Sequence, residues 1–118
     1  MWSLGITAQE IALGDPPYSK FTAAKVVALI LQEAPPQLPP TPWSSEFRNF
    51  VESCLVKNPK QRPPIDWLMK HCRGFLDKAK DSEYIRKNLT SKLPPQEQRL
   101  VPALQVKGAE FKTKIEAL

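Results

Sequence analysis

The side chains best suited to chemistry in this sequence are the thiols of Cys54 and Cys72 and the imidazole of His71, the only residues of their types. Thiolates and imidazoles can act as nucleophiles or bind zinc, but a structural zinc site needs four ligands at characteristic spacings. His71 and Cys72 lie far along the chain from Cys54, and no fourth ligand accompanies them. Two cysteines also cannot build a disulfide framework. We therefore expect no metal site, and we expect both cysteines at buried helix positions.

Charge is distributed unevenly along the chain. Residues 1–56 hold three basic and five acidic residues, whereas residues 57–118 hold fourteen and seven. A basic half can bind nucleic acid or an anionic membrane surface. Here acidic residues interrupt the basic ones and aromatic residues for stacking are scarce, so we expect solvated helix faces, with no nucleic acid and no membrane as partners. The start lacks the features of a signal peptide, which predicts a cytoplasmic location.

The element that must position the rest is a helix at residues 2–13. Gly14 follows it and can adopt the left-handed conformation that often ends a helix. Its apolar side chains point around most of the circumference, and Glu10 is its only charge. Such a helix is normally covered from several sides. Because nothing precedes Met1 to cover it, we expect the chain to be the second part of a domain, with this helix exposed as an apolar patch that invites self-association or a partner.

Thirteen prolines divide the remaining sequence into short segments, which predicts short helices joined by turns and little strand. The second helix is expected at residues 22–32, capped by Thr22, with core packing as the favoured use of its apolar residues. Ser44 is placed to cap the third helix. Pro36 and Pro39 have the spacing that aromatic grooves recognise, but a plain connecting loop is the favoured interpretation.

Two further helices are expected in the second half. One follows Pro63 and Pro64 and ends at Gly74. A weaker one runs over residues 82–89, with Ser82 as its cap. Beyond residue 92 the helical pattern dissolves. The buried face predicted for the fourth helix consists of Ile65, Leu68, Met69 and Cys72.

Several motifs then agree in identity, order and spacing with one family. They are Trp2-Ser3-Leu4-Gly5-Ile6-Thr7-Ala8, Gly14-Asp15-Pro16-Pro17-Tyr18, Trp43-Ser44-Ser45-Glu46-Phe47 and Cys54-Leu55-Val56-Lys57-Asn58-Pro59-Lys60-Gln61-Arg62-Pro63. Over residues 1 to 85 the chain resembles the lower half of a protein kinase catalytic domain, nearest to the Hippo-like branch of the sterile-twenty group of serine/threonine kinases.

This resemblance implies an all-α fold of four to five short helices, corresponding to helices F to I of the kinase C-lobe and followed by an irregular tail. The implied divisions are a partial C-lobe at 1–76, a helical extension at 77–92 and a flexible tail at 93–118. The residues implied as structural are Trp2, Gly5, Trp43 and Arg62. In the family, an arginine like Arg62 pairs with the glutamate of an Ala-Pro-Glu motif. That motif is missing here, so we expect Arg62 to turn to solvent, or the helices that correspond to F and H to shift and allow it.

The kinases that the chain resembles use ATP and magnesium, but the motifs for both are absent from these residues. Glycine occurs only at positions 5, 14, 74 and 108, so a Gly-x-Gly-x-x-Gly loop cannot form. The only histidine precedes Cys72, so there is no His-Arg-Asp base, and Asp-Phe-Gly does not occur. We therefore predict no catalytic, cofactor-binding or metal-binding residue.

Two functions remain open. The first is a truncated serine/threonine kinase fragment that is inactive alone and marginally stable. The second is a stand-alone helical interaction module that docks kinase substrates or regulators, because the second helix resembles the kinase helix G, a docking surface. Its candidate contact residues are Val26, Val27 and Leu29. Protein partners are thus expected through the first or the second helix.

Overall fold

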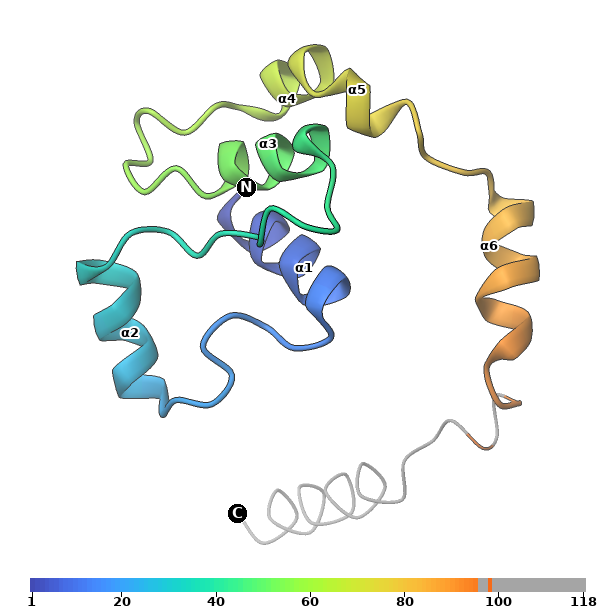
Figure 1. Cartoon of the computed structure of the whole chain (residues 1–118), viewed down its shortest axis with the longest axis horizontal. Coiled ribbons are helices and arrows are strands. Elements are labelled where there is room, and N and C mark those ends of the chain that lie inside the picture. Colours follow the sequence, from blue (N-terminus) through green and yellow to red (C-terminus); the bar gives the residue numbers. More distant parts are fainter. Residues whose placement is uncertain (96–97, 99–118) are drawn as a thin grey trace, which may run out of the picture. The chain divides into compact units, whose positions relative to one another are not determined.

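In the computed structural model of the chain, residues 1–95 and 98 are described. They form α1 (Trp2–Leu13), α2 (Ala23–Gln32), α3 (Ser45–Cys54), α4 (Ile65–His71), α5 (Arg73–Leu76), α6 (Ser82–Asn88) and the 3-10 turn η1 (Thr90–Lys92) (Figure 1). No strand occurs among the described residues, so the all-helical prediction is confirmed for them. Most of the predicted irregular tail, residues 96–97 and 99–118, lies outside the described part.

The chain divides into two compact units. The first is Met1–Ala79, and the second begins at Lys80. The first unit contains α1 to α5 and the second contains α6 and η1.

The first helix has the bounds that the sequence predicts. Gly14 ends α1 with φ 88°, and its backbone N–H donates to the carbonyl of Glu10 at 2.8 Å. Gly5 lies where α1 meets α3, because a Cβ added there would come within 2.8 Å of Cys54 Cβ and of two side-chain atoms of Leu55. The absence of a side chain at Gly5 therefore allows the two helices to approach closely.

The core of the first unit is built around α3, which lies between α1 and the pair α4 and α5 (Figure 1). Ser44 caps α3 as predicted, since its Oγ accepts from the N–H of Phe47 at 3.2 Å. The apolar side chains of α3 recur at helical spacing and turn toward both neighbours. The buried core consists of Leu38, Phe50, Val51, Cys54, Leu55, Leu68 and Cys72.

The expectation that α2 packs in the core is wrong. Thr22 caps this helix as predicted, but none of its residues is buried. Val27 is 56% exposed and Leu31 is 73% exposed. Lys57 holds the end of α2, because its Nζ donates to the carbonyl of Leu31 at 3.1 Å and also to the carbonyl of Glu33. The helix is closed at its start by its own cap, and its apolar residues are at most half-buried in this unit.

The predictions for the fourth helix are partly wrong. Leu68 and Cys72 are buried, whereas Ile65 and Met69 are 51% and 58% exposed. Gly74 does not end this helix: α4 ends at His71, and Gly74 lies inside α5. The seven-residue α4 has one covered side, so only part of its apolar stripe finds a partner.

The loop between α2 and α3 is fixed by a buried polar side chain. Gln9 of α1 is 1% exposed, and its Nε2 donates to the carbonyl of Pro36 at 2.7 Å. Leu38 is part of the core. The carbonyl of Pro36 is bonded to Gln9, and Leu38 is packed in the core. The segment from Pro36 to Pro39 is therefore a connecting loop of the fold.

The second unit contains a correction at the start of its helix. Asp81, not Ser82, caps α6, because its carboxylate accepts from the N–H of Tyr84 at 2.8 Å. The helix has no buried residue. Its N-terminal charge is favourable, since a carboxylate there interacts with the positive end of the helix dipole.

Candidate functional site

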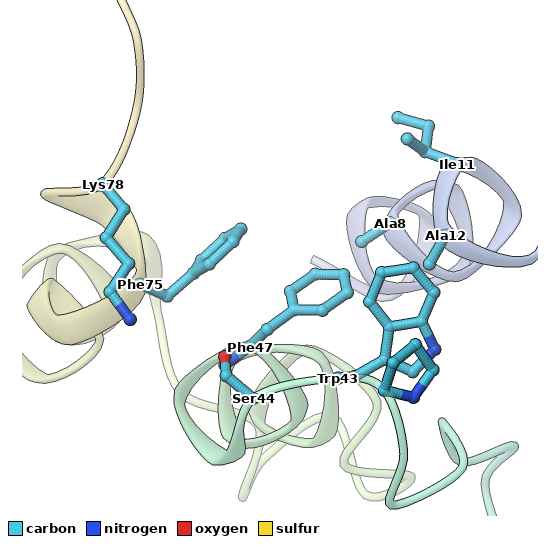
Figure 2. A pocket seen from close by; sticks show the side chains of 9 residues that line it. Ala8, Ile11, Ala12, Trp43, Ser44, Phe47, Phe75 and Lys78 are labelled. Atoms are coloured by element: carbon cyan, nitrogen blue, oxygen red, sulfur yellow. The ribbon is translucent and has the colours of Figure 1, made fainter.

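An apolar groove of about 510 Å³ lies between α1, α3 and α5 of the first unit. We call it the α1–α3–α5 groove. Apolar side chains make up nearly all of its surface, with one hydroxyl and one ammonium group (Figure 2). The lining residues are Ala8, Ile11, Ala12, Pro42, Trp43, Ser44, Phe47, Phe75 and Lys78.

Helical spacing places one wall of this groove. Ala8, Ile11 and Ala12 stand at offsets of three and four residues, which puts them on one side of α1. The small alanines leave room beside the helix, and Ile11 is 80% exposed. The groove therefore continues onto the open outer face of α1, where Leu4 is also exposed.

Aromatic rings form the opposite wall. The ring centroids of Trp43 and Phe47 are 5.7 Å apart in an edge-on arrangement, and those of Phe47 and Phe75 are 4.9 Å apart. Figure 2 shows Phe47 and Phe75 on the side facing α1. Such ring pairs stabilise one another. An apolar wall opposite a flat helix face is suited to contact with another apolar segment.

Polar chemistry in the groove is sparse. Lys78 Nζ lies 3.9 Å from a carboxylate oxygen of Glu46, a weak exposed ion pair. The pKa of the Glu46 carboxyl is lowered, mainly because the carboxylate accepts a hydrogen bond from the backbone N–H of Glu46 at the start of α3. The positive charge of Lys78 lowers this pKa further. The indole N–H of Trp43 is buried without a hydrogen-bond partner. These groups can orient a bound segment, but they do not form a nucleophile and base.

Arg62 lies on another side of the unit, near Trp2. Its Nε donates to the carbonyl of Val56 at 2.8 Å and its Nη2 to that of Lys57 at 3.2 Å. The guanidinium lies 5.4 Å from the ring centroid of Trp2. The prediction that Arg62 turns to solvent is therefore wrong, because two carbonyls and an indole hold it half-buried. None of the ion pairs among the described residues involves it.

The predicted docking residues are not part of the groove. Val27 is exposed, while Val26 and Leu29 are half-buried on α2, which contributes no lining residue. Sequence reasoning placed Trp43 among the structural residues but missed the groove and the buried Gln9. The available signal for the groove was the Ala8, Ile11 and Ala12 spacing, read as one face of α1.

The cysteines and histidine have structural surroundings. Burial raises the pKa of the Cys54 and Cys72 thiols, and the proximity of Cys72 raises that of Cys54 further. His71 stacks on Trp67 with ring centroids 4.3 Å apart. No group of three or more potential metal ligands is found in the described part of the chain. Among these residues, no helix has the length and apolar character needed to cross a membrane.

Comparison with known proteins gives the family. The model of the protein tyrosine and serine/threonine kinase family matches residues 1–72. Serine/threonine-protein kinase fray2 of Dictyostelium discoideum is 40% identical over 102 residues, which cover 84% of this chain and 10% of that protein. Serine/threonine-protein kinase ppk11 of Schizosaccharomyces pombe is 40% identical over 102 residues, which cover 86% of this chain and 32% of that protein. Serine/threonine-protein kinase TAO1-B of Xenopus laevis is 48% identical over 71 residues, which cover 60% of this chain and 7% of that protein.

The chain thus spans about a third or less of the length of these relatives. The family match covers α1 to α4, the helices that contain most of the core and part of the groove. The chain belongs to the protein tyrosine and serine/threonine kinase family and corresponds to a helical part of the kinase domain.

Proposed function

We propose that this chain is the helical scaffold part of a serine/threonine kinase domain of the sterile-twenty group, Hippo-like branch, and has no phosphoryl-transfer activity of its own. The observation that carries the proposal is the outer face of α1. Leu4 and Ile11 lie seven residues apart on one side of α1 and are 41% and 80% exposed, although they belong to one of the most apolar helices of the chain. An apolar face of this kind belongs against another element.

The occupant of this face is an apolar helical segment from the remainder of a kinase domain. The α1–α3–α5 groove would take one side of that segment, with Ile11 on one wall and Phe47 and Phe75 on the other. The unpartnered N–H of Trp43 would gain an acceptor there. Satisfying a buried donor and covering apolar surface both stabilise the complex.

Arg62 supports the same proposal. Its Nε and Nη2 are bonded to carbonyls, whereas its Nη1 bonds to no described residue. A carboxylate from the remainder of the domain could bind at this nitrogen, as the resemblance to kinases implies. The carbonyls and Trp2 would hold the guanidinium ready, so that less side-chain entropy is lost when the pair forms.

The direct test is phosphoryl transfer. The purified 118-residue chain is incubated with magnesium, radiolabelled ATP and a general acceptor protein, and an intact sterile-twenty group kinase serves as the positive control. We expect no transfer above background and no ATP binding by calorimetry, because the Gly-x-Gly-x-x-Gly, His-Arg-Asp and Asp-Phe-Gly motifs do not occur in this sequence. Transfer that persists through repeated purification would overturn the proposal, as would stoichiometric ATP binding.

A second function rests on a different helix. We propose that α2 can act as an interaction surface for kinase substrates or regulators, because Val27 and Leu31 are exposed on a well-capped helix. The chain would then compete with an intact sterile-twenty group kinase for a protein substrate. We expect added chain to inhibit that phosphorylation and the variant Val27→Glu to lose the inhibition. Equal inhibition by both proteins would exclude α2 as the surface.

We also propose that two copies of the chain associate through α1. Sedimentation of the chain over a range of concentrations tests it, with Ile11→Glu as the matched variant. A concentration-dependent dimer that this variant abolishes supports contact through the outer face of α1. The cytoplasmic location, and the need of the full-length family for ATP and magnesium, stay predictions from the sequence.

A further inference from the structure

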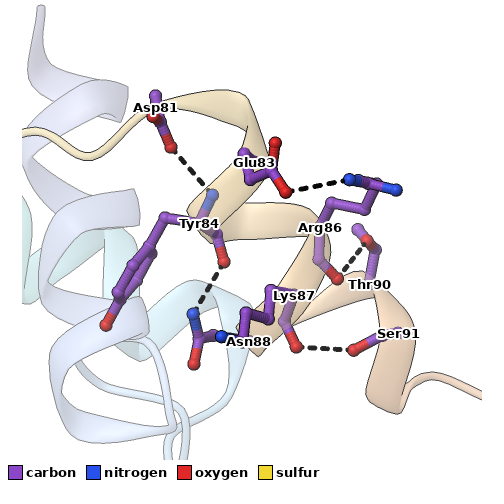
Figure 3. Close-up of polar contacts among 8 residues, drawn as sticks. All are labelled: Asp81, Glu83, Tyr84, Arg86, Lys87, Asn88, Thr90 and Ser91. Atoms are coloured by element: carbon purple, nitrogen blue, oxygen red, sulfur yellow. Dashed lines mark hydrogen bonds and ion pairs between the residues drawn. The ribbon is translucent and has the colours of Figure 1, made fainter.

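The end of α6 has an unusual set of side-chain hydrogen bonds (Figure 3). Asn88 Nδ2 donates to the carbonyl of Tyr84 at 3.0 Å, Thr90 Oγ1 to that of Arg86 at 3.0 Å, and Ser91 Oγ to that of Lys87 at 2.6 Å. A helix end leaves its last carbonyls without backbone partners. Thr90 and Ser91 satisfy two of the last four carbonyls of α6, whereas Asn88 bonds to the carbonyl of Tyr84, which precedes them. All three bonds are exposed to solvent.

Cations surround Thr90 on both sides. Arg86 and Lys87 precede it by four and three residues, and Lys92 follows it by two. Arg86 makes an exposed pair with Glu83 at 3.1 Å. Lys87 and Lys92 take part in none of the ion pairs of the described residues. Protein kinases select substrates partly by the charges that flank the acceptor hydroxyl. The basic residues around Thr90 would be attracted to an acidic substrate cleft.

The segment can also open. The helix α6 has seven residues and none is buried. Tyr84, Ile85 and Leu89 are 48%, 44% and 56% exposed, so little packing opposes unwinding. Isolated helices of this length are marginal in water. Local opening releases Thr90 Oγ1 from the carbonyl of Arg86 and allows the extended backbone that a substrate cleft requires.

We propose that Thr90 is a phosphorylation site for a basophilic serine/threonine kinase and that its modification unwinds the end of α6. In this step Thr90 Oγ1 bonds to the γ-phosphorus of ATP, the bond from that phosphorus to the bridging oxygen of the β-phosphate breaks, and ADP and the hydroxyl proton leave. The product cannot donate to the carbonyl of Arg86. It also places negative charge at the negative end of the helix dipole, which destabilises the last turn.

Ser91 is the alternative acceptor, and the geometry favours Thr90 over it. The Ser91 hydrogen bond is shorter, 2.6 Å against 3.0 Å, so its hydroxyl is held more tightly. Ser91 also lies one residue further from both Arg86 and Lys87. This inference concerns the second unit and does not depend on the function proposed for the first.

The test uses the full chain, the catalytic domain of protein kinase C as the basophilic probe, and magnesium ATP, with sites mapped by mass spectrometry. We expect phosphate on Thr90, its loss in Thr90→Val, and its retention in Ser91→Ala. The double variant Lys87→Gln with Lys92→Gln should be phosphorylated about tenfold more slowly, because the attraction to an acidic cleft is weakened. Circular dichroism of each variant establishes that the remaining helices are formed.

The second readout is the helix itself. The backbone N–H of Leu89 donates to the carbonyl of Ile85 at 2.9 Å, and it should exchange faster with deuterium after phosphorylation. Absence of phosphate on Thr90, an equal rate for the double variant, or an unchanged exchange rate at Leu89 would each overturn the proposal.

Discussion

Helices α2 and α3 are equal in length but differ in what covers them. Each has ten residues, and a hydroxyl side chain caps each N-terminus, from Thr22 in α2 and Ser44 in α3. Helix α3 buries Phe50, Val51 and Cys54, whereas α2 buries none of its residues. The more apolar of the two helices is the exposed one. Apolar content therefore shows how much surface a helix offers, and the neighbouring elements decide how much of it is buried.

The largest expected difference in the free energy of unfolding is between two leucine-to-alanine variants, one at the end of α3 and one in α2. Leu55 follows α3 and is 1% exposed, whereas Leu31 of α2 is 73% exposed. Leu55→Ala should cost about 2–5 kcal/mol of the free energy of unfolding, because it leaves a cavity. Leu31→Ala should change it by less than about 0.5 kcal/mol. Urea denaturation of both variants gives the two values, and similar losses would contradict the contrast.

The contact between α1 and α3 gives the next effect. In Gly5→Ala the new methyl group would stand 2.8 Å from Cys54 Cβ and Leu55 Cγ, so one helix must move. Overpacking of this kind costs about 1–3 kcal/mol. Thermal unfolding measures the loss, and Thr7→Ala on the exposed side of α1 is the control. Equal melting temperatures for wild type and Gly5→Ala would show that the helices do not pack as described.

The buried amide of Gln9 provides a test of similar size. Gln9→Met keeps the length of the side chain but leaves the carbonyl of Pro36 without its donor. The cost of leaving a fully buried acceptor unsatisfied is about 1–3 kcal/mol, and the half-buried carbonyl of Pro36 should fall toward the lower end of that range. Hydrogen exchange in the loop should also accelerate. If the variant is as stable as wild type, the hydrogen bond does not fix the loop.

The smallest expected loss from removing a hydrogen bond or a core contact is at the caps. Ser44→Ala and Thr22→Ala each remove a side-chain acceptor from a helix N-terminus and should each cost about 1 kcal/mol of helix stability. The Ser44 variant should lower the unfolding free energy of the whole unit, whereas the Thr22 variant should loosen α2 alone. Residue-resolved hydrogen exchange separates the two outcomes, and unit-wide loosening by Thr22→Ala would show that α2 belongs to the core.

Local signals in the sequence were sufficient for most of the helices. The caps at Thr22 and Ser44 and the glycine after α1 act within a few residues, so the bounds of α1 and α2 and the start of α3 follow from them. The sequence does not distinguish Asp81 from Ser82 as the cap of α6, because both residue types are good caps. Glycine often ends helices, which predicts a terminator at Gly74, but here Gly74 lies inside α5.

Burial and the groove were harder to predict because they depend on contacts between distant residues. The spacing of Ile65, Leu68, Met69 and Cys72 predicts one buried face of the fourth helix. Only Leu68 and Cys72 are buried, because other elements cover only that part of the face. Gln9 looks like a surface residue until its partner in the distant loop is known. Arg62 likewise finds carbonyls that no short-range pattern indicates.

Helix α3 buries three of its residues within this chain, whereas α2 buries none and α1 leaves Leu4 and Ile11 exposed. Residue-resolved amide hydrogen exchange of the monomeric chain tests this difference most directly. We predict slow exchange at Val51, Cys54 and Leu55, and fast exchange along Val26 to Leu31. Protection in α2 equal to that in α3 would contradict the account.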